Sequence, residues 1–158
     1  FQLDFYSDED LRDIIRRSAL LLNLQAPEEV IDRIAARSRA TPRVANALLK
    51  RVRDFSEVHE RALSEELCDE ACELFGIYAH GLTKDDRRYL ETLLKSFRGG
   101  PAGVQALAAA LHEDSDTVEH VYGPYLLRLG FIERSPRGRI LSPQGRSYLS
   151  GEKLGAIF

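Results

Sequence analysis

The chain has 158 residues, of which 44% are hydrophobic and 30% are charged, and its formal net charge is −3. That balance is typical of a globular protein with one ordinary domain or two small ones, and it argues against a generic polyanion binder. No apolar run approaches the roughly 20 residues of a membrane helix and no secretory leader is recognisable, so we expect no membrane partner. The sequence begins with Phe1 instead of Met, which suggests a processed product or an excised piece.

The two cysteines, Cys68 and Cys72, are four residues apart on a predicted helix. A disulfide scaffold would need more of them, so we expect a reducing compartment and a cytoplasmic location. No histidine or second cysteine pair stands near them, which argues against zinc and favours packed or idle thiols.

Charge is distributed unevenly along the chain. Residues 1–75 hold 11 Lys and Arg against 16 Asp and Glu, whereas residues 76–158 hold 11 against 9. Within residues 128–146, five arginines stand against one acid, Glu133. This local excess of positive charge is the candidate site for a polyanion.

The first half of the chain is predicted to form four amphipathic helices. Ser7 with Asp10 has the spacing of a capping box, and Ser64 is a predicted cap of the fourth helix. The helices are predicted over residues 7–23, 26–38, 41–58 and 64–75. Their predicted inward residues are Leu11, Ile14, Ile15, Ser18, Leu22, Val30, Ile31, Ile34, Ala35, Val44, Leu48, Leu49, Val52 and Phe55. Short connections are typical of a compact bundle, so residues 1–75 are a predicted domain and residues 76–82, without periodicity, a predicted linker.

Residues 83–150 have a different pattern, with three predicted helices before a β-hairpin. "RGGPAG" (98–103) breaks the chain as a turn, and Ser115 is predicted to cap a third helix that Pro124 kinks. The segments "FIER" and "RILS" are predicted strands around the turn "SPRG". This order is that of a winged helix, whose last helix and hairpin wing approach nucleic acid. The sequence therefore predicts a mainly α fold, a four-helix bundle followed by a winged helix, with a tail over 151–158.

Three arginines crowd the tip of the predicted hairpin. Arg134 and Arg139 fall near the strand ends, and Arg137 falls in the turn. A solvated turn usually carries one or two charges, and three cations with Glu133 as the one local acid repel each other. Contact with the phosphates of a nucleic-acid backbone explains these three cations better than a solvated turn does. Phosphate contacts position a protein without reading sequence.

The third predicted helix offers no base-reading set of Arg, Asn and Gln. It carries Asp116, Glu119 and His120, an acidic face poorly suited to the major groove. We therefore expect binding to the DNA or RNA backbone that does not depend on sequence.

Arg43 lies in the first turn of the predicted helix that follows Thr41, a good N-cap, and Pro42. A cation is mildly unfavourable there, because the helix N-terminus already carries partial positive charge. Two explanations stay open. One is an ion pair with Asp32 or Glu29 on the preceding helix, and the other is an anion bound by Arg43 together with the helix N-terminus.

Motifs of autonomous catalysis do not occur in the sequence. There is no G-x-x-x-x-G-K-[ST] phosphate loop, the 4 histidines have no H-E-x-x-H spacing, and no Ser or Cys has the setting of a catalytic nucleophile. We therefore name no catalytic or metal-binding residue, and we do not expect the chain by itself to hydrolyse ATP.

Four stretches resemble the RuvB family, in matching order and over roughly residues 3–146. They are "LDFYSDEDLRDIIRRSA", "RSRATPRVANALLKRVRDF", "GGPAGVQALAAAL" and "DTVEHVYGPYLLRLGFIERSPRGR". The resemblance implies the C-terminal part of a bacterial ATP-driven motor that migrates Holliday junctions, with an AAA+ lid domain over 1–75 and a DNA-binding winged helix over 83–150. The nucleotide-binding core that precedes these parts in the family is missing from this sequence.

The resemblance also implies roles for individual residues. Arg43 matches the family's second sensor arginine, which reaches ATP on the core, and Tyr6 matches a nucleotide-contacting tyrosine. Arg134 and Arg139 match the DNA-contacting arginines of the wing, and Arg137 joins them on charge. The implied partners are Holliday-junction arms and duplex DNA, RuvA, and other RuvB subunits in a hexameric ring. ATP with Mg would bind through the missing core, and no cofactor is expected in the chain alone.

The sequence departs from the family pattern at a few positions. "RATPR" replaces the usual "RGTPR", so Ala40 must adopt backbone angles that a glycine often takes. Ala47 and Ser115 stand where arginine is common, and the change at Ser115 weakens a DNA role for the start of the third helix. Two alternatives stay open, a free-standing winged-helix transcription regulator and a protein-interaction module.

Overall fold

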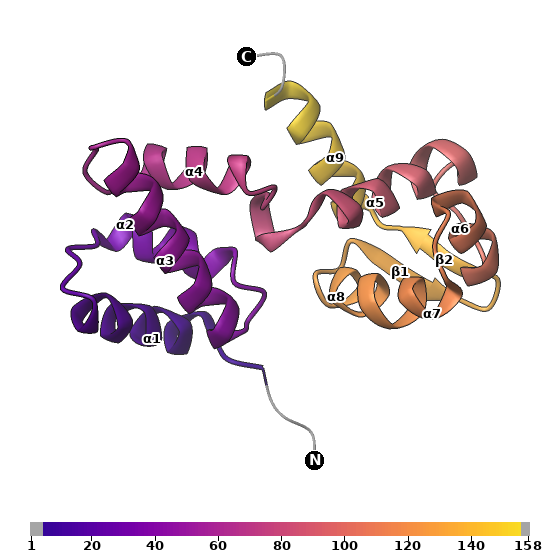
Figure 1. The fold of residues 1–158 in the computed structure, drawn as a ribbon. Coiled ribbons are helices and arrows are strands. Elements are labelled where there is room, and N and C mark those ends of the chain that lie inside the picture. Colours follow the sequence, from indigo (N-terminus) through magenta and orange to yellow (C-terminus); the bar gives the residue numbers. More distant parts are fainter. Residues whose placement is uncertain (1–4, 156–158) are drawn as a thin grey trace. The chain divides into compact units, whose positions relative to one another are not determined.

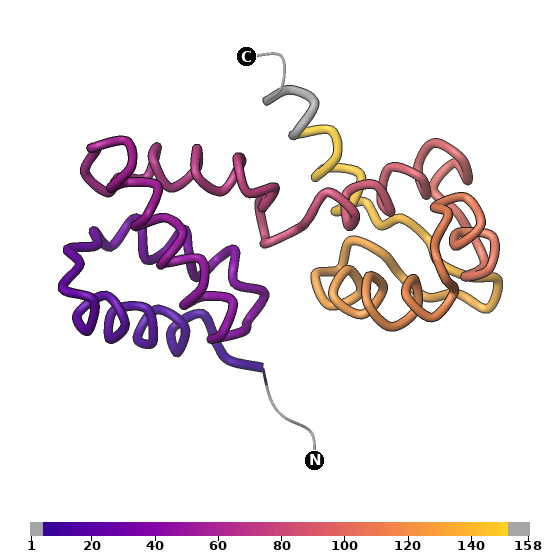
Figure 2. Tube along the Cα trace, in the orientation of Figure 1, coloured from indigo at the N-terminus to yellow at the C-terminus, as the bar shows by residue number. Residues whose placement is uncertain are grey.

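The computed structural model describes the backbone of residues 5–155 and the side chains of residues 5–151. It divides into two compact units, Phe1–Thr83 and Lys84–Phe158 (Figures 1 and 2). The described part of the first unit is helical, and the second combines helices with a two-stranded antiparallel hairpin. The mainly α fold class is therefore confirmed. Within the described residues, no helix has the length and hydropathy needed to cross a bilayer.

The first unit is a bundle of four helices, as the sequence pattern predicts. The helices are α1 (Asp8–Leu21), α2 (Glu28–Ala36), α3 (Pro42–Val58) and α4 (Glu65–Leu74). Their inward faces meet in one core, made of Leu11, Ile15, Ala19, Val30, Ile31, Ile34, Ala35, Ala45, Leu48, Leu49, Val52, Leu67, Cys68, Ala71 and Cys72. Both cysteines are free, and a hydrogen bond with Cys72, together with burial, raises the pKa of the Cys68 thiol. The two side chains therefore pack as small apolar groups.

Side chains cap two of these helices as predicted and fail to cap a third. At α1, the backbone N of Asp10 donates to Ser7 Oγ at 3.1 Å, and the backbone N of Ser7 donates to the Asp10 carboxylate at 3.2 Å. Ser64 Oγ accepts from the backbone of α4 at 3.1 Å. Thr41 holds the predicted N-cap position of α3, but its hydroxyl donates to the carbonyl of Arg39 at 3.1 Å and makes no cap bond to the helix. Helix α3 therefore begins without a side-chain cap.

The inward face of α3 is rotated by one residue at its start. Val44, predicted to point inward, is 36% exposed, whereas Ala45 is fully buried. Between α1 and α3, Ser18 Oγ donates to Asn46 Oδ1 at 2.6 Å. This bond directs Asn46, the residue after Ala45, toward α1, which is consistent with the burial of Ala45 instead of Val44.

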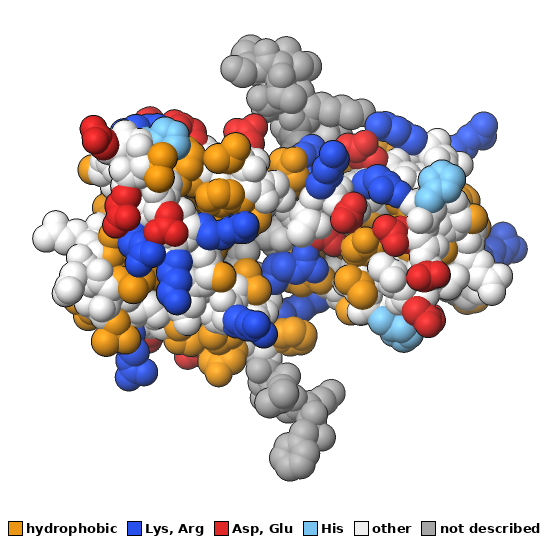
Figure 3. Space-filling model, in the orientation of Figure 1, with side chains coloured by type: hydrophobic (Ala, Val, Ile, Leu, Met, Phe, Trp, Pro, Cys, Tyr) orange, Lys and Arg blue, Asp and Glu red, His pale blue; other side chains and the backbone are white. Residues whose placement is uncertain are grey.

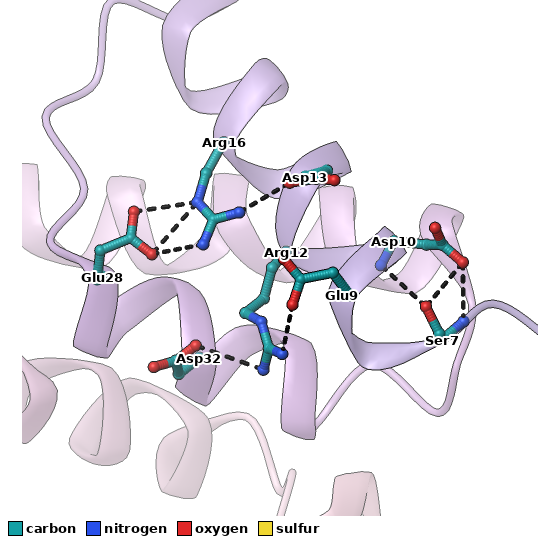
Figure 4. Close-up of polar contacts among 8 residues, drawn as sticks. All are labelled: Ser7, Glu9, Asp10, Arg12, Asp13, Arg16, Glu28 and Asp32. Carbon is teal, nitrogen blue, oxygen red and sulfur yellow. Dashed lines mark hydrogen bonds and ion pairs between the residues drawn. The ribbon is translucent and has the colours of Figure 1, made fainter.

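Ion pairs on the outside of the bundle join α1 to α2 (Figure 4). Arg16 donates to both oxygens of Glu28, with Nη2 to Oε2 at 2.8 Å, and Arg12 lies 3.7 Å from Asp32. The hydrogen bond from Arg16 lowers the pKa of Glu28, and desolvation opposes that shift. These pairs are exposed, so they orient the two helices more than they stabilise them. Asp32 is thus engaged by Arg12 and not by Arg43.

The predicted linker, residues 76–82, is itself folded. Ala79–Gly81 forms the short 3-10 turn η1, the backbone N of Tyr78 donates to the carbonyl of Leu82 at 2.8 Å, and the Leu82 side chain is fully buried. Gly76 has a φ of 69° just after α4, as expected of a glycine that ends a helix. The segment therefore belongs structurally with the first unit.

The second unit has the element order of a winged helix. It contains α5 (Lys84–Phe97), α6 (Val104–Leu111), a third helical stretch, β1 (Ile132–Ser135), β2 (Gly138–Leu141) and α9 (Pro143–Gly155). Its fully or nearly fully buried residues include Tyr89, Leu90, Leu93, Leu107, Leu111, Val118, Leu126, Ile132 and Leu141. The sequence pattern does not predict α9, which follows the hairpin.

The third helical stretch changes geometry along its length. Its parts are α7 (Ser115–Thr117), the π-helical turn η2 (Val118–Tyr122) and α8 (Gly123–Arg128). Pro124 is the second residue of α8, in its first turn, where its missing N–H and its ring are tolerated. The cap predicted at Ser115 is wrong, because Asp114 holds the N-cap position and makes no side-chain cap bond.

The loop between α2 and α3 contains two consecutive left-handed residues, Arg39 (φ 51°) and Ala40 (φ 55°). The expectation for Ala40 is confirmed, and it leads to a prediction. Ala40→Gly stabilises the first unit by about 0.5–1 kcal/mol, because glycine adopts this conformation without Cβ strain. Urea denaturation followed by circular dichroism measures the change. Ala47→Gly, on the exposed face of α3, is the control and destabilises by about 1 kcal/mol; stabilisation by both changes would contradict the explanation.

A second prediction concerns the pH dependence of the Glu28–Arg16 pair. Because the pKa of Glu28 is lower in the folded than in the unfolded chain, the ionised carboxylate stabilises the fold at pH values above the ordinary glutamate pKa. This stabilisation is lost as the pH falls through the lower pKa of the folded state. Arg16→Gln therefore raises the pKa of Glu28 in the folded protein, which NMR titration of its carboxyl group measures. Arg17→Gln, a neighbouring exposed position, leaves that pKa unchanged. An unmoved Glu28 pKa in Arg16→Gln would show that the pair does not form in solution.

Candidate nucleic-acid interface and anion site

The predicted wing is an antiparallel hairpin with a short loop. Its register places Arg134 directly opposite Arg139 and Ser135 opposite Gly138, so Arg137 lies in the loop. Ser135 Oγ donates to the carbonyl of Gly138 at 2.9 Å and accepts from the backbone N of Arg137 at 3.3 Å. The structure thus brings the three arginines singled out from the sequence together on the outer half of one hairpin.

Strand β2 is bonded on its other side as well. The backbone N of Arg139 donates to the carbonyl of Ala102 at 2.8 Å, and the backbone N of Ala102 donates to the carbonyl of Arg139 at 2.9 Å. Residues 98–103, expected to be a turn only, therefore also pair with the wing. Gly138 is required at this point, because its φ is 129° and an added Cβ would lie 2.2 Å from the carbonyl oxygen of Ala102.

The charges of the wing lack acid partners within the described part of the chain. Arg134 and Arg137 are exposed, Arg139 is half-buried, and none of them forms an ion pair with a described residue. Burial raises the pKa of Tyr89 to about 12, and the nearby charge of Arg139 works against that shift. Like charges directly opposite in a hairpin are destabilising. Backbone pairing therefore holds Arg134 and Arg139 together against their repulsion, and a bound anion would relieve it.

The third helical stretch does not extend this basic surface. Asp116 and Glu119 are exposed, and His120 Nε2 lies 4.0 Å from the Glu119 carboxylate. Val121 is 58% exposed among them. Figure 3 shows acidic and basic side chains interspersed over the face in view. The positive charge without acid partners is therefore confined to the wing and is not a property of the whole unit.

Arg43 is exposed in the first turn of α3 and forms no ion pair with any described residue. The structure thus contradicts the alternative in which Asp32 or Glu29 neutralises it. A depression of about 240 Å³ lies beside it. The depression is lined by Arg43, Val44, Ala47, Leu48, Arg51 and Ile77. An uncapped helix N-terminus with an unpaired guanidinium is suited to an anion.

Sequence reasoning missed Arg51 as a second cation of this depression. Its guanidinium carbon lies 4.6 Å from the centre of the Phe75 ring, which holds the side chain across the face of α3. Arg51 follows Arg43 by two steps of four residues, with Ala47 between them, so helical spacing was the signal that could have found it.

Tyr6 lies elsewhere on the first unit. It is 49% exposed, in a depression of about 370 Å³. That depression is lined by Tyr6, Asp10, Asp13, Ile14 and Arg17. It shares no lining residue with the depression at Arg43, so the described chain does not bring the two candidate nucleotide contacts into one pocket.

Comparisons with known proteins match both units. A family model described as the RuvB AAA lid domain matches residues 6–78, and one described as the RuvB C-terminal winged helix domain matches residues 79–150. The chain is 45% identical over 151 residues to the Holliday junction branch migration complex subunit RuvB of Dehalococcoides mccartyi (strain CBDB1), covering 95% of this chain and 43% of the relative. It is 50% identical over 150 residues to the protein of that name from Synechococcus sp. (strain CC9311), covering 94% and 42%.

A solved structure is similar over the same extent. It is the Thermotoga maritima RuvB Holliday junction branch migration motor, with a TM-score of 0.86, 41% sequence identity, and coverage of 94% of this chain and 50% of that chain. The chain therefore spans less than half the length of the two curated relatives and half of the solved chain.

The unpaired state of Arg43 leads to a prediction for stability. Arg43→Ala changes the unfolding free energy of the chain by less than about 0.5 kcal/mol, because no described contact is lost. Urea denaturation measures it. Arg37→Ala is the control, since it breaks a half-buried pair with Asp69 at 2.8 Å and costs about 1 kcal/mol or more. A loss of several kcal/mol in Arg43→Ala would show that this residue has a structural role.

The like-charged pair Arg134 and Arg139 leads to a second prediction for stability. Arg134→Thr stabilises the DNA-free second unit by about 0.2–1 kcal/mol at low salt, because the repulsion with Arg139 disappears. Thermal unfolding measures it, and the gain shrinks in 1 M salt, where the screening length is about 3 Å. Arg137→Thr, in the loop, is the control and gives less. A loss of stability in Arg134→Thr would mean that the arginine has an acidic partner in solution.

Proposed function

Because this chain belongs to the RuvB family, we propose that it forms the DNA-engaging C-terminal part of an ATP-driven motor that migrates Holliday junctions. Two features of the chain support this assignment. The first unit corresponds to the family's lid domain and the second to its winged helix, in the family's order. Each unit also carries unpaired arginines where a phosphate would bind.

The wing contacts the DNA backbone through Arg134, Arg137 and Arg139. The observation that carries this is the placement of Arg134 directly opposite Arg139, without acid partners among the described residues and with β2 bonded on both sides. The backbone positions of these two arginines are therefore fixed before DNA arrives, so only their side chains need to be ordered on binding. Guanidinium groups bind phosphate oxygens in bidentate fashion, which suits a contact that must step along DNA of any sequence.

Binding without sequence preference is supported by the third helical stretch. In sequence-reading winged helices this element enters the major groove, where Arg, Asn and Gln pair with base edges. Here it presents Asp116, Glu119 and His120. A branch-migrating protein must pass over every sequence, and a wing that carries the contact alone is consistent with that requirement.

The lid contributes Arg43 and Tyr6 to a nucleotide held on an ATPase core outside this chain. The exposed, unpaired guanidinium of Arg43 at an uncapped helix end fits a terminal phosphate, and Tyr6 fits contact with another part of the nucleotide. ATP, bound with Mg, would supply free energy through hydrolysis of its terminal phosphate. Arg43 would bind the nucleotide more strongly in one state, before or after hydrolysis, than in the other, and this difference would bias the position of the lid.

The further partners follow from the family and are part of the proposal. They are RuvA, which engages the junction, and additional RuvB subunits in a hexameric ring around duplex DNA. The chain alone carries no phosphate-binding loop in its sequence, so we propose DNA binding without ATP hydrolysis as its isolated activity.

The wing is tested by substituting Arg134, Arg137 and Arg139 together with Ala. We predict weaker binding to a fluorescent duplex and to a four-way junction, and a log–log salt slope reduced in magnitude by about 2.7, which is about 0.9 for each of three phosphates. Titrations from low to moderate salt measure both. A charge-matched triple variant of the first unit, Arg17, Arg53 and Arg61 to Ala, is expected to leave the slope unchanged.

Other outcomes of this titration favour other functions. Equal affinity of the original chain and the wing variant would remove the wing from DNA binding and favour a protein-interaction module. Strong preference for one duplex over a scrambled duplex would favour a transcription regulator.

A further inference from the structure

The folded linker contacts the loop that precedes Arg43. Gly81, in η1, is buried, and its carbonyl accepts a hydrogen bond from Arg39 Nη1 at 3.4 Å. Arg39 belongs to the α2–α3 loop, which comprises residues 37–41. The two bonded residues are 42 positions apart in the sequence, so the contact is a property of the tertiary fold alone.

Gly81 lies in close contact with the α2–α3 loop. Its φ is 72°, and an added Cβ would lie 2.6 Å from the carbonyl oxygen of Arg37 and 2.9 Å from Arg39 Cγ. Any other residue therefore forces the linker and the loop apart. Gly76, at the start of the linker, has a similar φ of 69° but open space around its Cβ position. The two glycines therefore have similar backbone conformations, but only Gly81 lies in close contact with another segment.

The start of the linker reaches the surface that carries Arg43. Ile77 lines the depression beside Arg43, and its backbone N donates to the carbonyl of Cys72 at 2.8 Å, which ties it to the end of α4. The linker is thus bonded to the α2–α3 loop through Gly81 and to the end of α4 through Ile77, which also borders the depression at α3. Attachments on both sides of a short turn leave it little freedom to act as a hinge.

We propose that residues 77–82 and the α2–α3 loop form one rigid body, with Gly81 and Arg39 as its positioning residues. A displacement of Arg43 then moves the chain that enters α5 directly, without a free joint within residues 77–82. This inference rests on the proposed function, in which Arg43 responds to a nucleotide. It assigns the transmission of that response to a packed contact and not to a flexible tether.

Native-state hydrogen exchange of the whole chain tests the proposal. The reporters are two hydrogen-bonded backbone amides, Thr41 in the loop and Tyr78 in the linker. If the segments open together, Gly81→Ala accelerates exchange at both amides by the same factor, of about tenfold or more given the usual cost of overpacking. Gly76→Ala introduces comparable backbone strain without a clash, and it leaves the Thr41 amide unchanged.

Arg39→Ala is a second variant that adds no atoms and remains informative if Gly81→Ala fails to fold. It accelerates Thr41 and Tyr78 together by a smaller common factor. Acceleration of Tyr78 alone, or of neither amide, would overturn the proposal. Equal acceleration of the Cys68 amide in α4 would also overturn it, because it reports loosening of the whole unit. The experiment needs no nucleotide, so its result is independent of whether Arg43 senses ATP.

Discussion

The wing depends on a backbone that holds two arginines opposite each other. Strand β2 is bonded to β1 on one side and to Ala102 on the other, and Gly138 permits the close approach that this requires. Because Arg134 and Arg139 are directly paired, their side chains lie on the same face of the hairpin. The backbone hydrogen bonds of the hairpin thus keep two like charges on opposite residues of neighbouring strands, an arrangement that costs stability.

The first unit repeats this relation between an unfavourable charge and a fixed backbone. Arg43 stands at the positive end of α3, where a cation is disfavoured, and the N-cap residue Thr41 makes no side-chain cap bond. The loop before it holds Arg39 and Ala40 in left-handed conformations and contacts Gly81 of the linker. In both units a cation stands where local electrostatics disfavours it, and in both a bound phosphate would reverse that cost. Both candidate sites therefore have the electrostatic character that suits a phosphate group.

Much of the helical fold could be predicted from periodicity, and the errors have physical causes. The four inward residues of α2 were predicted correctly because every alternative face is charged. At α3, Val44 and Ala45 both satisfy the spacing, and the contact with α1 decides between them. The pairing of residues 98–103 with β2 joins segments far apart in sequence, and the packing of the linker does the same, so neither has a local signal.

The candidate sites were likewise predictable only in part. The cluster of wing arginines can be recognised in the sequence as an excess of positive charge, but the direct opposition of Arg134 and Arg139 follows only from the strand register. The sequence singled out Arg43 as a cation in the first turn of a helix. In the structure it pairs with neither of the acids suggested for it, and Asp32 lies beside Arg12 instead. Tyr6 and Arg43 line separate depressions, which the sequence alone could not show.

The most direct test of the central claim is to map amide chemical shifts of the chain at low salt on addition of two duplexes of unrelated sequence. The account predicts that the backbone amides of Arg134, Arg137 and Arg139 shift with the same midpoint for both duplexes, while those of η2 and α7 stay in place. Larger shifts in η2 and α7, or midpoints that differ between the two sequences, would contradict it and show that the third helical stretch reads DNA.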